Sequence, residues 1–143
     1  MTSQGFLIFA AGLSATAGVL HLAIIAGGAR WYRFFGAGER MARMAEAGRA
    51  YPAVATLGIA AVLFLWSAFA LSGAGAIGPL PWTRVALVAI TAVYLLRGLL
   101  FVPALALAHR PVTPFAWWSS VICLGFGLVH LAGLLGWALP PKA

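Results

Sequence analysis

Negatively charged side chains are nearly absent from this sequence of 143 residues. Two carboxylates, Glu39 and Glu46, stand against nine lysines and arginines, and charged residues make up only 8% of the chain. The sequence also has no paired-carboxylate arrangement, no serine-centred nucleophile motif and no glycine loop that would cradle a phosphate. It therefore carries no signature of a catalytic class.

Cysteine is equally scarce, because Cys123 is the only one. A single cysteine excludes an intrachain disulfide and a metal site built on paired cysteines. Of the three histidines, His21 and His130 lie in predicted spans and His109 in the third loop. They lie at three different depths, so we expect no metal site.

Apolar residues fill most of the chain, at 64% of the composition with a mean hydropathy of +1.03. A soluble fold has too little interior for this much apolar surface, so lipid must be the solvent for much of it. We predict an all-α integral membrane protein, a single domain over residues 1–143 whose four transmembrane helices form an antiparallel bundle. The predicted spans are 6–27, 52–71, 82–103 and 115–139, each with about 20 residues or more. The first is too long for a signal peptide and should remain as a helix.

Arginine positions predict the orientation in a bacterial inner (plasma) membrane. The first and third loops carry six basic residues near the span ends, and the opposite side carries only Arg84 and Lys142. The side richer in arginine faces the cytoplasm, so both termini should lie on the periplasmic side. The net charge of +7 is explained by this topology, and we expect no nucleic-acid partner.

The first loop, residues 30–49, is the only substantial polar segment. From Ala37 to Arg49, apolar residues recur at helical spacing, at Met41, Met44, Ala45 and Gly48. This pattern predicts a short amphipathic helix on the cytoplasmic surface, preceded by the aromatic and basic anchor WYRFF.

Arg97 lies inside the third predicted span, with apolar residues on both sides. A cation there costs roughly 2.5–3.5 kcal/mol on insertion scales, so it must face protein, water or an anionic ligand. Counting residues from the cytoplasmic ends allows His21, Tyr94 and Arg97 to meet. Two partners stay open for Arg97: Glu39, folded back from the first loop, or an anionic ligand. We name His21, Tyr32, Glu39, Tyr94 and Arg97 as candidate ligand-binding residues, and no catalytic residue is assigned.

His130 in the fourth span is a second intramembrane polar position. It should lie about 10 Å nearer the periplasmic side than His21, so the two are offset for axial ligation of a haem b. We therefore expect no cofactor. An interhelical hydrogen bond is the favoured role for each histidine.

Three functions fit these features. One is a binding protein whose cytoplasm-facing intramembrane pocket takes a membrane lipid or another anionic amphiphile. A second is a structural or assembly subunit, working with a membrane partner protein or as a homo-oligomer. The third is a small enzyme using His21 or Glu39 with Arg97. In size and helix number the chain resembles the MAPEG glutathione and eicosanoid enzymes; the segment ERMARMAEAGRAYP resembles their basic Arg–Asn–Glu region but lacks the Asn.

Overall fold

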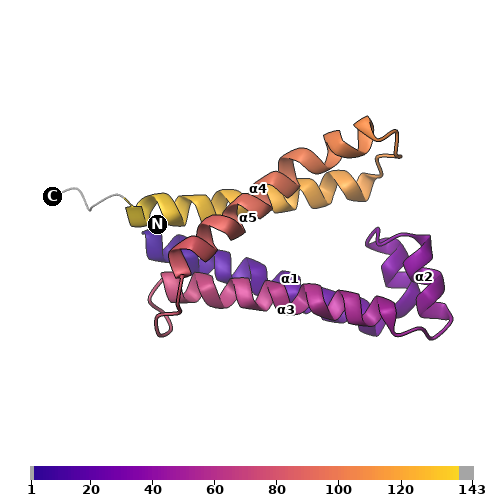
Figure 1. The fold of residues 1–143 in the computed structure, drawn as a ribbon, viewed down its shortest axis with the longest axis horizontal. Coiled ribbons are helices and arrows are strands. Elements are labelled where there is room, and N and C mark those ends of the chain that lie inside the picture. Colours follow the sequence, from indigo (N-terminus) through magenta and orange to yellow (C-terminus); the bar gives the residue numbers. More distant parts are fainter. Residues whose placement is uncertain (1, 139–143) are drawn as a thin grey trace. The chain divides into compact units, whose positions relative to one another are not determined.

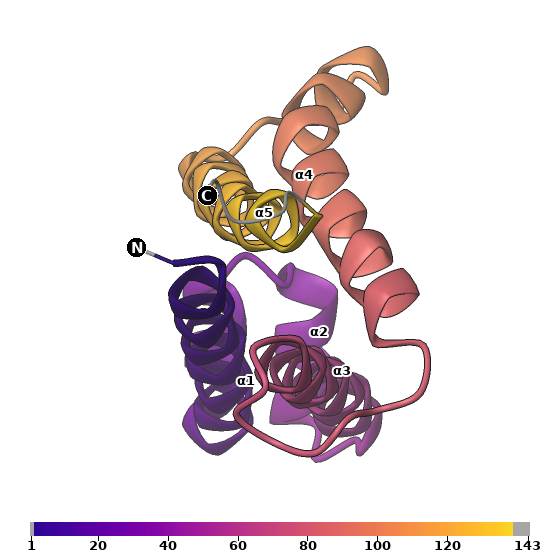
Figure 2. The same cartoon turned by 90° about the vertical axis from the view of Figure 1, so that its left-hand side faces the viewer.

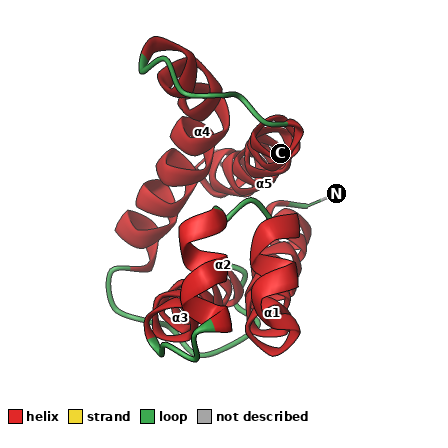
Figure 3. Cartoon of the chain, turned by 90° about the vertical axis from the view of Figure 1, so that its right-hand side faces the viewer, coloured by secondary structure: helices red, strands yellow, loops and turns green. Residues whose placement is uncertain are grey.

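The computed structural model describes residues 2–138, and every regular element in that range is an α-helix (Figure 3). The structure is 82% helical. The five helices are α1 (Ser3–Phe34), α2 (Glu39–Glu46), α3 (Tyr51–Gly73), α4 (Thr83–Leu107) and α5 (Pro114–Ala138) (Figure 1). The predicted fold class is confirmed, with a short helix α2 in the first loop.

Helices α1, α3, α4 and α5 are long and apolar enough to cross a membrane. The predicted spans differ from them by a few residues at most ends. The predicted fourth span extended to Leu139, which lies outside the described residues. Pro103, the predicted end of the third span, lies within α4, which continues to Leu107.

The first helix departs most from its predicted end. The backbone kinks at Gly28, with φ 62° and ψ −152°, and helical structure resumes as far as Phe34. Only glycine adopts such a conformation without strain. The aromatic segment predicted as an interfacial anchor therefore continues the helix after a change of direction.

The chain forms two compact units. Unit 1 contains residues 1–14 and 66–143, and unit 2 contains residues 15–65.

In unit 2, α2 packs on the last turns of α1 through a small cluster of buried side chains. Tyr32, Ile24 and Ala42 form its centre, with Met41 and Ala45 against it. The predicted apolar face consisted of Met41, Met44, Ala45 and Gly48, and it did not include Ala42. Ala42 is fully buried instead, because a methyl group leaves room for the Tyr32 ring.

In unit 1, α4 crosses α5 at a point of close backbone approach (Figure 2). A Cβ atom added at Gly98 would lie 2.7 Å from the backbone nitrogen of Leu124. One added at Gly127 would lie 2.7 Å from the Leu95 side chain. Residue numbers rise on one helix as they fall on the other, so the two helices are antiparallel. Glycine at both positions lets the helices touch, as is common between membrane helices.

Candidate functional site

Arg97 lies on α4, about 15 Å before the end of that helix at Leu107. Its Nη1 donates to Ser120 Oγ at 3.4 Å and its Nη2 donates to Ser119 Oγ at 3.3 Å. Its Cζ atom lies 3.5 Å from the ring centroid of Phe101. The guanidinium is thus held between two neutral hydroxyls and an aromatic face.

The positions of these groups follow from the crossing of α4 and α5. Gly98 is the next residue after Arg97, and it brings the α4 backbone against α5. Ser119 also donates its own hydroxyl to the Ala116 carbonyl at 3.2 Å. Its oxygen lone pairs are therefore free to accept from Arg97, and its proton is directed away.

A second polar group in unit 1 is centred on Tyr94, which lies one turn before Arg97. The Tyr94 hydroxyl hydrogen-bonds Ser14 Oγ at 3.1 Å, and both residues are buried. The Tyr94 ring lies 5.0 Å from Trp66, 5.5 Å from Phe126 and 5.2 Å from His130, between centroids. Four helical segments, from α1, α3, α4 and α5, therefore meet at this tyrosine.

His130 is fully buried beside Tyr94. Its Nδ1 donates to the Phe126 carbonyl, one turn back on α5, at 2.9 Å. Its Nε2 is then an acceptor, and it has no hydrogen-bond partner among the residues described here. The sequence predicted a hydrogen bond between His130 and another helix. The observed hydrogen bond of His130 lies within α5 instead, and His130 contacts α4 through the Tyr94 ring.

The remaining candidates, His21, Tyr32 and Glu39, belong to unit 2. His21 Nδ1 donates to the Ala17 carbonyl of its own helix at 2.7 Å. Tyr32 is buried beneath α2, and its hydroxyl accepts from Thr56 Oγ1 at 3.2 Å. These contacts give Tyr32 a role in holding α2.

Within unit 2, Arg33 is the partner of Glu39. Its Nε and Nη2 each donate to one Glu39 oxygen at 2.9 Å, and its Nη1 donates to Glu46 Oε1 at 2.7 Å. Arg43 Nε lies 3.5 Å from Glu39 Oε1. We call Arg33, Glu39 and Glu46 the Arg33 clamp. It uses both of the chain's side-chain carboxylates.

The Arg33 clamp also fixes the ionisation of these carboxylates. Hydrogen bonds from Arg33 lower the pKa of Glu39 and that of Glu46 below their ordinary value near 4.5. A general acid at neutral pH needs a raised pKa instead. The geometry thus favours a structural carboxylate at Glu39 over an acid in catalysis.

The structure therefore groups Tyr94 with His130, which the sequence did not predict, and Arg97 with Ser119 and Ser120. These contacts depend on how each helix is rotated about its own axis, and a single sequence does not show that rotation directly. A pocket shared by His21, Tyr32, Glu39, Tyr94 and Arg97 would require residues of both units, and it stays a prediction. No group of three metal-ligating side chains occurs within residues 2–138.

Four apolar helices of spanning length, one with an arginine in its interior, define a small polytopic membrane protein. No family model, curated protein or solved structure matches the chain. Its function has to be inferred from its own residues.

Proposed function

We propose that this membrane protein binds an anionic amphiphile, with the phosphate or carboxylate head at Arg97. One observation carries the proposal: Arg97 lies in a membrane-spanning helix with only neutral partners, while Arg33 holds both side-chain carboxylates. Charges inside the membrane are costly and usually functional. An anion from outside the chain would supply the missing counter-charge.

The hydrogen bonds of Arg97 leave room for such an anion. A guanidinium has five N–H donors, and two of them make contacts of 3.3 and 3.4 Å, longer than the usual range of about 2.7–3.2 Å. Bonds to a carboxylate or phosphate are shorter and roughly twice as strong. Phe101 covers one face of the guanidinium, so the anion would approach in the plane of its donors.

The surroundings favour an amphiphile over a soluble anion. Trp117 and Trp118 are exposed in the first turn of α5, as aromatic residues are at the headgroup level of membranes. Ser119 and Ser120 follow them directly, so the Arg97 head site lies just below that level. A polar head there would have its apolar tail among lipid-facing side chains.

We also propose that this end of α4 and α5 faces the cytoplasm of a bacterial inner membrane. The asymmetry of arginines between the loops supports this orientation, which puts both termini on the periplasmic side. A lipid bound at Arg97 would then come from the cytoplasmic leaflet.

Native mass spectrometry of protein released from nanodiscs tests the Arg97 site. With equal amounts of phosphatidylglycerol and phosphatidylcholine, the natural protein should retain phosphatidylglycerol. Arg97→Gln should retain one anionic lipid fewer, whereas Arg110→Gln, in the exposed loop of the same unit, should match the natural protein. Unchanged retention by a folded Arg97→Gln variant would refute the proposal.

A second variant shows whether a loss of lipid by Arg97→Gln results from misfolding. Ser119→Asp places a carboxylate on the donors of Arg97, which neutralises the charge within the chain. This variant should fold and also lose the anionic lipid. A folded Ser119→Asp variant that still holds the same lipid would contradict the proposal.

A further inference from the structure

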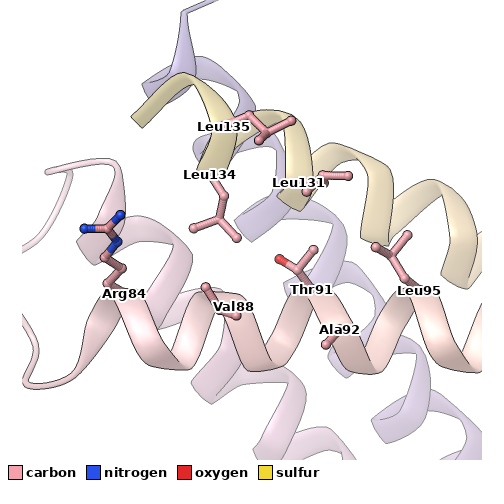
Figure 4. Close-up of a pocket in the computed structure, with 8 residues that line it drawn as sticks. All are labelled: Arg84, Val88, Thr91, Ala92, Leu95, Leu131, Leu134 and Leu135. Atoms are coloured by element: carbon pink, nitrogen blue, oxygen red, sulfur yellow. The ribbon is translucent and has the colours of Figure 1, made fainter. Parts of the chain in front are cut away.

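A groove opens between α4 and α5 along the first half of α4, from Arg84 to Leu95 (Figure 4). Its volume is about 580 Å³, within the range of about 300–1,000 Å³ typical of small-molecule sites. Arg84 lies at one end and Leu95 at the other. Leu131, Leu134 and Leu135 of α5 also line the groove, and Figure 4 shows Leu134 pointing toward α4. The walls are apolar and the only charged group is Arg84.

The crossing explains why the groove exists and where it ends. Gly98 and Gly127 bring α4 and α5 into contact, and Leu95 fills the contact from the α4 side. Beyond Leu95 the helices separate toward the start of α4, and Figure 1 shows α4 crossing α5 rather than running parallel to it. The groove is the opening that this crossing angle leaves.

Arg84 lies at the level of the membrane surface. Trp82, two residues earlier, is 80% exposed, as expected of an aromatic side chain among headgroups. Arg84 is itself exposed, and it has no ion pair or hydrogen bond within the described range. Its charge is therefore available to an anion at the mouth of the groove.

The length of the groove identifies what it would hold. Eleven residues separate Arg84 from Leu95, or about 16 Å along α4 at 1.5 Å per residue. One leaflet is about half of a 30 Å hydrocarbon core, so the groove matches a single acyl chain. A partner helix would need contact along the whole core, and a soluble ligand would need several polar groups to fix its orientation. Thr91 adds little polarity, because its hydroxyl donates to the Leu87 carbonyl at 2.7 Å.

We infer that this groove holds one acyl chain of an anionic phospholipid, with the lipid phosphate on Arg84. The lipid belongs to the leaflet on the side where α4 begins, opposite to the Arg97 end. The inference does not depend on the function proposed for Arg97, because it stands on different residues at the other end of α4.

Photo-crosslinking in nanodiscs tests the groove directly. The probe is phosphatidylglycerol with a photoreactive diazirine on one acyl chain, and the crosslinked residues are mapped by peptide mass spectrometry. Crosslinks should concentrate on the groove residues of α4 and α5. Arg84→Gln should lower them about five-fold, the effect of one arginine near an anionic surface, and Arg97→Gln should leave them unchanged.

Two valines give a matched control for the groove itself. Val88 lines the groove and is 55% exposed, while Val93 lies on another face of α4 and is 48% exposed. Val88→Trp should fill the groove and abolish the crosslinks, and Val93→Trp should preserve them. Crosslinks spread evenly over lipid-facing residues, or equal in the two variants, would overturn the inference.

Discussion

Replacing Gly98 by alanine tests the packing on which both proposed lipid sites depend. The added Cβ would lie 2.7 Å from Leu124 N, 2.9 Å from Leu124 Cα and 2.9 Å from Leu124 Cβ. The first two are backbone atoms, which cannot rotate aside as a side chain can. The two helices must therefore separate at their crossing.

The magnitude follows from a comparison with Gly125→Ala. Gly125 also lies inside a spanning helix, but nothing lies within 4 Å of a Cβ added there. Alanine favours a helix over glycine by about 1 kcal/mol, and this gain is common to both variants. The difference between their free energies of unfolding is then the overpacking cost at Gly98, about 1–3 kcal/mol.

Equilibrium unfolding in mixed detergent micelles, followed by tryptophan fluorescence, measures this difference. Gly98→Ala should unfold at a lower denaturant fraction than Gly125→Ala, and it should also retain less anionic lipid. Equal stabilities for the two variants would mean that α4 and α5 do not touch at Gly98, and the described crossing would be wrong.

The remaining predictions concern the Arg33 clamp and Tyr94. Because the pKa values of Glu39 and Glu46 are lowered in the folded protein, their contribution is complete above about pH 4.5 and is lost as the pH falls through the lowered values. Hydrogen exchange in α2, corrected for pH, should therefore accelerate in that acid range. At pH 7, Arg33→Gln should accelerate it and Arg40→Gln should not; similar exchange in both would rule out the clamp. For the Ser14–Tyr94 hydrogen bond, the Ser14→Ala and Tyr94→Phe double-mutant cycle should give a coupling of about 0.6 kcal/mol, typical between membrane helices. Strictly additive effects would show that the bond contributes nothing.

The spanning helices could be predicted because the bilayer imposes a length and a composition on each. The kink in α1 could not be predicted, because the sequence does not show which backbone conformation Gly28 adopts. A glycine in an apolar run gives no sign of whether its backbone stays helical. Here it takes a positive φ, and the helix resumes through Trp31 to Phe34. The same aromatic residues had predicted a surface anchor.

The pairing of Glu39 with Arg33 was not predicted from the sequence, and its physical reason is chain entropy. The cost of burying Arg97 suggested that it would attract a carboxylate, although 58 residues separate the two. Arg33 is only six residues from Glu39, across a turn in which Gly36 and Gly38 take positive φ. Closing a short loop costs less entropy than closing a long one, so the pairing of Arg33 with Glu39 is favoured over a pairing with a distant arginine. The spacing of Arg33, Glu39 and Glu46 was the signal in the sequence.

The Arg33 clamp has a consequence for the rest of the molecule. With both side-chain carboxylates held in unit 2, no side chain of unit 1 carries a negative charge at neutral pH, yet Arg84 and Arg97 both lie in α4. We propose that their counter-charges come from outside the chain, from the anionic lipids of the two proposed sites. Each arginine near an anionic leaflet gains about 1 kcal/mol. On this proposal the charges that hold α2 all belong to the protein, whereas the energy of α4 depends on the charge of the surrounding lipids.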